Sequence, residues 1–390
     1  MEMETLLEHI REDELVEVCR QLVRINSVNP PGAESEIAEF VAQYLRKAGL
    51  EAEIVQHTLQ RASVLARIRG SGELPGVLFS AHLDTVPVGV EKWNHDPFAG
   101  ELSEGKIWGR GAADMKGGLA AVMLAAKALA QARLTLRGDV ILALTADEEV
   151  NGLGAIALSE RRDLQPLQAI LVAEPSGNEI FIAEKGILWL EIVTRGKTAH
   201  GSMPELGRNA VMMMVKLLAE LEKLSVPFEP HPLLGGFSLS VNSVSGGIKA
   251  NVVPDYCIAT VDMRTVPGQD HADIFRQIEA LIADLARRDP EFFGEAKVIN
   301  DWPAIVTAAD EPVVRRFNDA LAAVTGHHSA LKGVRYYTDA AALVPALGAP
   351  MLICGPGEAG MAHQPEEYVA VDKLVEAARI YTWAAFKLLN

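Results

Sequence analysis

The spacing of apolar residues predicts an α/β architecture for the first part of the chain. Three segments have helical apolar spacing or are rich in Ala, Leu and Met, and are predicted to be helices: 4–24, 34–48 and 115–131. Three short apolar runs are predicted to be buried strands: 76–82, 139–146 and 169–174. Strands that alternate with helices indicate a largely parallel sheet.

The pattern changes after residue 178. Four segments are predicted to be strands: 187–196, 237–246, 252–264 and 296–301. Two further segments, 206–224 and 270–288, are predicted to be helices, which gives the order β-α-β-β-α-β. We therefore expect a small domain at 179–302, inserted between two parts of a larger α/β domain, 1–178 and 303–390, which ends in a helix at 371–389.

Length, charge and cysteine usage limit the class of protein. A chain of 390 residues is too long for one ordinary core, so two compact units are expected. The formal net charge of −16 argues against a general nucleic-acid surface. The 3 cysteines lie far apart without a CxxC pair, which argues against a disulfide framework and fits a reducing cytoplasm. The acidic N-terminus is unlike a signal peptide, and no apolar stretch is long enough to span a bilayer.

The strongest chemical signal is the acidic run Asp147, Glu148 and Glu149, directly after the predicted strand 139–146. Three adjacent carboxylates repel one another unless a cation neutralises them. Glu148 and Glu149 should point to different sides, so that one can bind a metal while its neighbour handles a proton. A solvated acidic turn is the alternative, but ligands bind beyond the carboxyl ends of the strands in an open α/β sheet.

Three further candidates lie close to predicted strands and helices. His82 and Asp84 follow the apolar run at 76–82, and their i, i+2 spacing would let Asp84 orient a metal-binding His82. A capped strand end explains this pair equally well. Asp114 precedes a predicted helix and has glycines on both sides. An N-cap explains Asp114 taken alone, although a carboxylate there could equally bridge two cations.

Two other candidates carry little weight by themselves. Glu174 ends the predicted strand 169–174, where a solvent-exposed carboxylate is the simpler explanation. His363 lies in a loop after the GPG at 355–357, and a lone loop histidine is usually just exposed.

Several other patterns are set aside. The glycines at 152–154 resemble a dinucleotide fingerprint, but the acidic run before them would repel a pyrophosphate. The pair His327-His328 is expected on the surface, and the run at 212–214 is expected in the core or at an interface.

Five motifs taken together resemble the M20 metallopeptidase family, the group of acetylornithine deacetylase, succinyl-diaminopimelate desuccinylase and carboxypeptidase G2. They occur in the family's order over nearly the whole chain: FSAHLDTVP, GAADMKGG, ADEEVNG, AEP and AHQPEE. The resemblance implies a metal-dependent exopeptidase-like catalytic domain with an inserted ferredoxin-like lid and dimerisation domain. Two departures are the absence of an arginine-rich segment after AEP, which weakens succinyl-diaminopimelate as the substrate, and Glu366, where relatives often have Asp or Asn.

The resemblance also implies roles for individual residues. His82 would bind one metal ion and His363 the other, with Asp114 bridging both. Glu149 would complete one metal site and Glu174 the other. Asp84 would hold His82, and Glu148 would be the general base. These roles suit two divalent cations, which lower the pKa of water and polarise a scissile carbonyl.

Three residues of the inserted segment gain roles only from the resemblance. His200, in GKTAHGSMPELGRNA, would donate to the developing oxyanion, reaching across from the other subunit of a dimer. Asn251 and Arg264 would bind the substrate's α-carboxylate. Arginine suits a planar carboxylate, although a structural salt bridge is the alternative for Arg264. Thr338-Asp339 also falls in a family motif region, without an assigned role.

The sequence therefore predicts a hydrolase that cleaves an amide bond next to a free carboxylate, as an N-acyl-amino-acid deacylase. Carboxypeptidase or dipeptidase activity on the same site is the alternative. Two metal ions are expected, zinc first, with cobalt and manganese as alternatives. We expect a cytoplasmic homodimer that pairs through the lid domain, acts on a small molecule, and binds neither nucleic acid nor membrane. A non-catalytic binding homologue would be expected to lose ligands or base, and a nucleotide-dependent enzyme is disfavoured by the acidic run.

Overall fold

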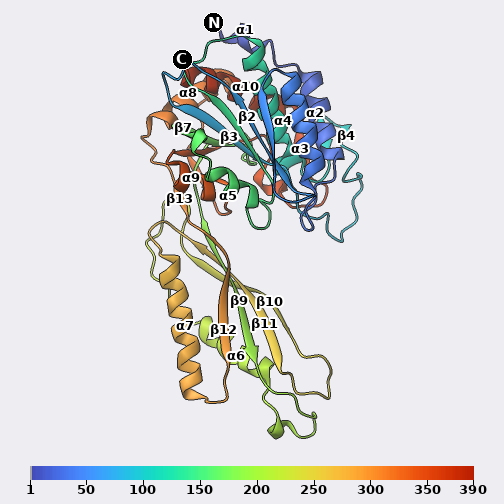
Figure 1. Ribbon diagram of the computed structural model, residues 1–390, viewed down its shortest axis with the longest axis vertical. Coiled ribbons are helices and arrows are strands. Elements are labelled where there is room, and N and C mark those ends of the chain that lie inside the picture. Colours follow the sequence, from blue (N-terminus) through green and yellow to red (C-terminus); the bar gives the residue numbers. More distant parts are fainter. Residues whose placement is uncertain (1) are drawn as a thin grey trace. The chain divides into compact units, whose positions relative to one another are not determined.

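The computed structural model describes residues 2–390, and its contacts divide the chain into two units (Figure 1). The larger unit comprises the residues up to Ala183, together with Val306–Gly333 and Thr338–Asn390. The smaller unit comprises Glu184–Ile305 and Val334–Tyr337. Both segments of the smaller unit thus lie between parts of the larger one in the sequence.

A nine-stranded mixed sheet forms the centre of the larger unit, in the order β1-β2-β6-β3-β7-β15-β8-β13, with β14 paired to β8. The central strands β6, β3, β7 and β15 are parallel. The nine strands are β1 (Glu51–Gln56), β2 (Ala62–Ile68), β3 (Gly76–His82), β6 (Val140–Thr145), β7 (Leu167–Val172), β8 (Phe181–Glu184), β13 (Ile305–Val306), β14 (Lys332–Val334) and β15 (Met351–Ile353). A separate small sheet pairs β4 (Glu101–Ser103), β5 (Lys106–Trp108) and β16 (Tyr368–Ala370).

Burial of the central strands explains their composition. Every residue of β3 and β6 is buried, so these strands are continuous apolar runs rather than alternating ones. The predicted strands at 76–82, 139–146 and 169–174 are confirmed within two residues. Because β6, β3 and β7 are parallel neighbours, their carboxyl ends lie at one edge of the sheet.

Helices pack on this sheet. Helix α4 (Gly117–Gln131) contacts β3 and β6 and is buried almost all round, as its Ala- and Leu-rich sequence requires. The C-terminal helix α10 (Val371–Leu388) packs against α4 and α8. The remaining helices of this unit are α1 (Met3–Leu7), α2 (Glu12–Arg24), α3 (Glu34–Lys47), α5 (Leu153–Ser159), α8 (Pro312–Thr325) and α9 (Ala340–Leu347).

The prediction of one continuous helix at 4–24 is wrong. The segment 4–24 forms two helices, α1 and α2, with a break at residues 8–11. Ile10 is buried within the break and keeps the apolar spacing, so periodicity alone does not reveal it. Arg11 has an extended backbone and precedes three acidic residues in the first turn of α2, where the helix dipole favours negative charge.

The smaller unit confirms the β-α-β-β-α-β order. Its elements are β9 (Gly186–Arg195), α6 (Ala210–Leu221), β10 (Ser238–Gly246), β11 (Tyr256–Thr265), α7 (His271–Arg288) and β12 (Gly294–Trp302). The four strands form an antiparallel sheet in the order β10-β11-β9-β12. Residues of α6 and α7, including Met213, Met214 and Ile278, join residues of β9 and β11 in one apolar core. Met213 and Met214 are therefore core residues, which confirms the core alternative for these two, whereas Met212 is exposed.

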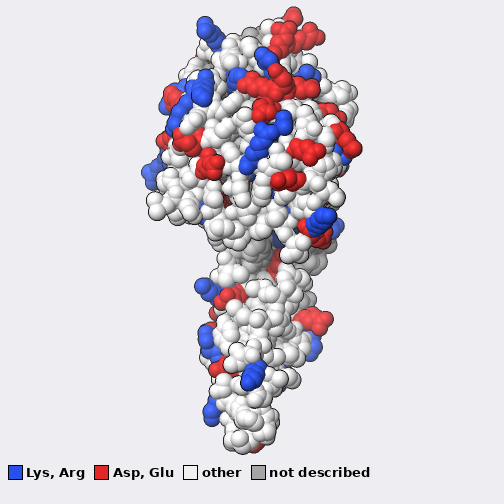
Figure 2. All heavy atoms as spheres, turned by 90° about the vertical axis from the view of Figure 1, so that its right-hand side faces the viewer, with Lys and Arg blue, Asp and Glu red and all other residues white. Residues whose placement is uncertain are grey.

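The surface carries both signs of charge. Figure 2 shows acidic and basic side chains interspersed over one face, with acidic groups gathered at the top of the view. Within residues 2–390, no helix is both long and apolar enough to cross a bilayer. Cys19, Cys257 and Cys354 are buried and form no disulfide.

Candidate active site

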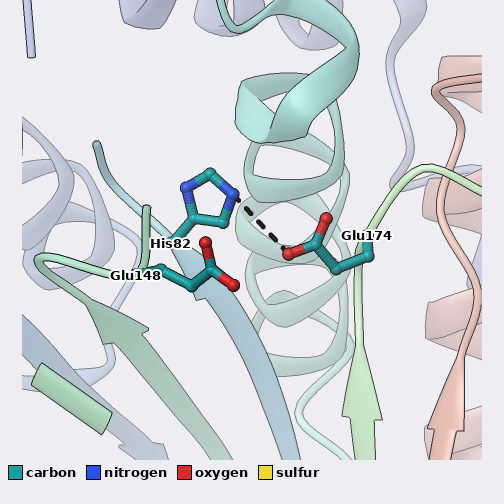
Figure 3. A group of neighbouring side chains, drawn as sticks. All are labelled: His82, Glu148 and Glu174. Carbon is teal, nitrogen blue, oxygen red and sulfur yellow. Dashed lines mark ion pairs between the residues drawn. The ribbon is translucent and has the colours of Figure 1, made fainter. Parts of the chain in front are cut away.

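The candidate residues of the larger unit gather where parallel strands end. His82 is the last residue of β3 and pairs in register with Thr145, the last residue of β6. The acidic run follows β6, and Glu174 lies two residues beyond β7. Figure 3 shows the carboxylates of Glu148 and Glu174 beside the imidazole of His82, in agreement with the shared edge of the three strands.

Asp114 lies between the two candidate histidines. Its Oδ1 lies 3.0 Å from Nε2 of His82, and its Oδ2 lies 3.4 Å from Nε2 of His363. On the first side, Oε1 of Glu174 lies 3.6 Å from Nε2 of His82. On the second side, Oε2 of Glu149 lies 3.2 Å from Nε2 of His363. One carboxylate thus joins two histidine-carboxylate pairs that are far apart in the sequence.

The backbone around Asp114 explains how its side chain reaches this position. Asp114 has non-helical dihedral angles, and α4 begins only at Gly117 without a side-chain cap. The N-cap explanation for Asp114 is therefore wrong. A Cβ atom at Gly118 would lie 2.1 Å from the carbonyl oxygen of Ala173, so glycine is required for the close approach of α4 to the segment that carries Glu174.

Burial and the interactions between these side chains shift their pKa values. Burial, together with the neighbouring carboxylates, raises the pKa of Glu148 and of Glu174 well above the usual range. Burial opposes ionisation of Asp114 too, but hydrogen bonds with His363 and His82 outweigh it and lower its pKa. Hydrogen bonds with Asp114 and Glu149 raise the pKa of His363 to about 10. The site therefore crowds several carboxyl groups together, with the imidazoles of His82 and His363 between them.

These residues fit a pair of divalent metal ions. Their ligand atoms lie within 4.8 Å of one another in two groups, His82 with Glu148 and Glu174, and His82 with Asp114 and Glu149. Oε1 of Glu149 is buried and has no hydrogen-bond partner among the described residues. Imidazole and carboxylate ligands together suit zinc and related first-row cations. An unpartnered buried carboxylate oxygen is costly unless a cation neutralises it.

Asp84 contacts the site differently from the expectation. Nδ1 of His82 lies 2.9 Å from the backbone oxygen of Asp84, but 3.8 Å from its carboxylate Oδ1. The carboxylate instead accepts hydrogen bonds of 3.2 Å from the backbone N–H groups of Glu148 and Glu149. Asp84 thus orients His82 through its main chain and holds the acidic run through its side chain.

Sequence reasoning missed two residues that hold the acidic run from outside. The side-chain amide of Asn29 donates to Asp84 at 2.9 Å and to Asp147 at 2.8 Å. Arg61 donates to the Oδ1 of Asn29 at 2.6 Å and forms an ion pair with Asp147. The NPPG at 29–32 pointed only to a turn, so nothing in the local sequence distinguished Asn29 from an ordinary turn residue.

Asp339 falls in a family motif region to which the sequence assigned no role. In the structure it lies close to the candidate active site. It is buried and accepts a hydrogen bond from the hydroxyl of Thr145, at the end of β6. Burial raises its pKa to about 6. Its charge also acts on Glu148 and Glu174, so Asp339 is a further carboxylate around the candidate base.

The other three candidates belong to the smaller unit. The segment around His200 pairs with the segment around Asn251, since His200 bridges Val252 and the N–H of Gly201 donates to the Asn251 oxygen at 2.8 Å. His200 is exposed. Arg264 lies on β11 and forms a two-point salt bridge with Asp262, at 2.8 and 2.9 Å. The salt bridge considered as an alternative for Arg264 is therefore present.

The histidine pair is exposed as expected, and Gly152 and Glu366 have contacts or conformations of their own. Gly152 has a φ of +66° and precedes the short helix α5, where glycine tolerates the left-handed conformation. His327 and His328 are exposed. Glu366 lies outside the candidate site, where its Oε2 contacts Nδ1 of His95 at 2.6 Å.

The fold and this group of residues define a metal-dependent hydrolase. The family model described as "Peptidase family M20/M25/M40" matches residues 78–387, and the chain therefore belongs to this family. The resemblance stated from the five motifs is confirmed.

Curated relatives match over nearly the whole chain. A "Probable succinyl-diaminopimelate desuccinylase" of Staphylococcus epidermidis is 27% identical, with 95% of this chain and 97% of the relative covered. An "Acetylornithine deacetylase" of Myxococcus xanthus is 30% identical, with 88% of this chain and 90% of the relative covered.

Solved structures share the fold at lower identity. An M20 family metallo-carboxypeptidase from Sulfolobus solfataricus matches with a TM-score of 0.83 and 20% identity, over 97% of this chain and 100% of that one. A dinuclear metal-binding peptidase of the M20 family from Bacillus subtilis matches with a TM-score of 0.73 and 19% identity, over 97% and 98% of the two chains. The predicted fold class and the prediction of a metal-dependent enzyme are confirmed.

Proposed function

We propose that the chain hydrolyses the amide bond of an N-acyl-amino acid, next to a free carboxylate, with two divalent metal ions. The ligands would be His82 and Glu174 for one ion and His363 and Glu149 for the other, with Asp114 shared by both. Zinc is the metal we favour, with cobalt and manganese as alternatives. The single observation that carries the proposal is the position of Asp114, whose two oxygens face Nε2 of His82 at 3.0 Å and Nε2 of His363 at 3.4 Å.

The protein's own groups supply proton transfer. When bound, two divalent ions would polarise the scissile carbonyl and lower the pKa of an attacking water. Glu148 would take the proton of that water and return it to the leaving amine. Its raised pKa supports this role, because a base must also act as an acid near neutral pH. The carboxylate of Asp84 would keep Glu148 in place by accepting a hydrogen bond from the backbone N–H of Glu148.

Residues of the smaller unit would recognise the substrate and the charge that develops on it. We propose that His200 donates a hydrogen bond to the oxyanion and that Asn251 and Arg264 bind the substrate's carboxylate. The antiparallel pairing of the segments around His200 and Asn251 supports a common task for these two residues. Asp262 holds Nε and Nη2 of Arg264, which fixes the plane of the guanidinium before a substrate arrives.

The name of the Myxococcus relative supports a deacylase, since it describes a deacetylase at 30% identity. Carboxypeptidase or dipeptidase activity is the second candidate. It is supported by the Sulfolobus structure, whose title names a metallo-carboxypeptidase. Both reactions break an amide bond beside a carboxylate, so they differ only in the group on the acyl side.

A substrate panel tests the proposal. Purified protein loaded with zinc would be assayed on N-acetyl-amino acids, N-succinyl-amino acids and dipeptides, each with its C-terminal carboxamide as a matched control. We expect turnover of at least one free-carboxylate substrate and much weaker turnover of its carboxamide. Metal analysis should find two ions per chain. A metal-replete protein that holds no ions would overturn the metal-site assignment, and equal turnover of carboxamides would overturn the carboxylate requirement.

We further propose a homodimer that pairs through the smaller unit. Strand β10 is an edge strand whose residues are exposed on both faces, including Val241 and Val244. Helix α6 exposes Met212 and Val215. An exposed strand edge is a template for pairing with another chain, and an exposed apolar patch marks an interaction site. We also propose a cytoplasmic location, which the three thiols without disulfides support.

A further inference from the structure

Two separate loops carry the candidate ligands Asp114 and His363. Asp114 follows the segment 109–113 after β5, and His363 lies in the segment before β16. His363 has a φ of +64°, a left-handed conformation that is uncommon for a residue with a side chain. Its side chain is 52% exposed, so packing around the imidazole does little to hold it. The imidazole contacts Asp114 and Glu149, and the loop is also held by contacts of its main chain.

Glu367 provides these contacts for the first loop. Its side chain is fully buried, and its Oε1 accepts hydrogen bonds of 2.9 Å from the N–H groups of Ala113 and Asp114. Its Oε2 accepts a 3.0 Å hydrogen bond from the N–H of Gly111. Its backbone oxygen accepts another, of 2.9 Å, from Gly109. One residue thus binds four of the N–H groups at 109–114, including that of the proposed bridging ligand.

Arg110 connects the same loop back to His363. Its Nη1 donates to Oε2 of Glu367 at 2.5 Å and to the backbone oxygen of Gln364 at 3.2 Å. Its Nη2 makes a longer contact, 3.5 Å, with the backbone oxygen of His363. Arg110 is buried, so these charge-assisted hydrogen bonds are shielded from water. Each loop therefore contributes a side chain that binds the main chain of the other loop: Glu367 binds the segment 109–114, and Arg110 binds the segment at 363–364.

We propose that Glu367, with Arg110, is a positioning residue that sets the distance between Asp114 and His363 and thereby the geometry of the second metal ion. It would touch neither the substrate nor the metal. The inference rests on the proposed function, since it assumes that these two residues bind an ion. Nothing in the local sequence separates Glu367 from Glu366 beside it, but only Glu367 faces the ligand loop.

The test compares Glu367→Gln with Glu366→Gln in the full chain, using Co²⁺ as the probe. Glutamine keeps the shape of the side chain but turns one acceptor into a donor that faces backbone N–H groups. We expect Glu367→Gln to weaken binding of the second Co²⁺ by about 10- to 100-fold, as changes behind metal ligands typically do. Its visible absorption spectrum at saturating Co²⁺ should also differ from wild type. Glu366→Gln should match wild type in both measurements.

The outcomes separate this inference from the proposed function. A wild-type protein that binds no Co²⁺ under replete conditions would overturn the proposed metal sites themselves. A wild-type protein that binds two ions, with a Glu367→Gln variant of unchanged affinity and spectrum, would overturn only the positioning role. If Glu367→Gln does not fold, Arg110→Lys decides, because lysine keeps the charge but loses the fork that reaches Gln364. Weakened second-ion binding in Arg110→Lys supports the role, and wild-type binding overturns it.

Discussion

The carboxylate of Asp84 accepts a hydrogen bond from the backbone N–H of Glu148, with 3.2 Å between Oδ1 and N. The neighbouring N–H of Glu149 donates to the other oxygen at the same distance. Since the imidazole of His82 contacts the backbone oxygen of Asp84 and not its carboxylate, the two parts of Asp84 serve two different neighbours. The proposed base and a proposed ligand are therefore positioned by one side chain.

Replacing Asp84 by Asn should affect the acidic run more than His82. The Asn amide can accept only one of the two N–H hydrogen bonds, so the turn that carries Glu148 should loosen. We expect kcat to fall about 10- to 100-fold. The imidazole N–H proton of His82, followed by NMR, should keep its wild-type chemical shift because its acceptor is a backbone oxygen. A large change of that shift, with kcat unaffected, would contradict this division of roles.

Glu148→Gln should separate metal binding from proton transfer. Glutamine cannot accept the proton of the attacking water, so kcat should fall roughly 10²- to 10⁴-fold. Metal content, measured by mass spectrometry, should stay at the wild-type value because Glu148 is not one of the five proposed ligands. Glu160→Gln, which changes an exposed carboxylate beyond α5, is the matched control. A Glu148→Gln variant with wild-type turnover would remove Glu148 as the base.

Glu34 should make stability depend on pH. Burial, followed by the charge of Asp84, raises its pKa from 4.5 to about 7, and neither carboxylate oxygen has a hydrogen-bond partner among the described residues. The unfolded chain loses this proton near pH 4.5 and the folded protein near pH 7, so the folded state binds more protons in between. The free energy of unfolding should therefore fall as the pH rises through this interval.

Glu34→Gln removes this dependence. The variant should be more stable than wild type at pH 8, by up to about 3 kcal/mol at about 1.4 kcal/mol per pKa unit, less the lost attraction to Arg61. The difference should shrink as the pH approaches 4.5. Urea unfolding of metal-free protein at several pH values measures it. Glu36→Gln, at an exposed position on the same helix, should show no such trend. A constant difference at all pH values would contradict the burial argument.

If the proposed dimer forms through β10, a charge introduced on β10 should disrupt it, and a charge introduced on β12, the other edge strand of the same sheet, should not. Val244 on β10 is 53% exposed, and Ile299 on β12, the other edge strand, is 42% exposed. Val244→Glu should place a charge in the interface and shift the mass measured by light scattering from two chains to one. Ile299→Glu should leave the mass unchanged. A wild-type protein that is monomeric at assay concentrations would end the proposal.

Arg264 should affect binding of substrate more than stability. Arg264→Lys keeps the charge but loses the planar fork, so KM for a free-carboxylate substrate should rise about tenfold or more. The carboxamide analogue should bind the variant and wild type alike. If Arg264 only stabilises β11 through Asp262, the variant would instead lower the melting temperature and leave KM unchanged.

The sequence by itself determined the fold class and the candidate ligands. Buried strands such as 76–82 and 139–146 are apolar throughout because both faces are covered, and that pattern is visible without coordinates. His82, Asp114 and Glu174 could be named because each follows or precedes such an element and because the motifs occur in one family's order. The sequence did not reveal the break after α1, since Ile10 continues the apolar spacing through it.

Only the tertiary structure decided how these residues are held. Asn29 and Glu367 lie 55 and 253 positions from the residues they bind, Asp84 and Asp114, and hydrogen bonds over such separations leave no local pattern. The use of the Asp84 carboxylate for backbone N–H groups also depends on the turn after β6, which periodicity does not describe. Chemistry at strand ends can therefore be predicted from residue type and order. The contacts that orient it arise from packing between distant segments.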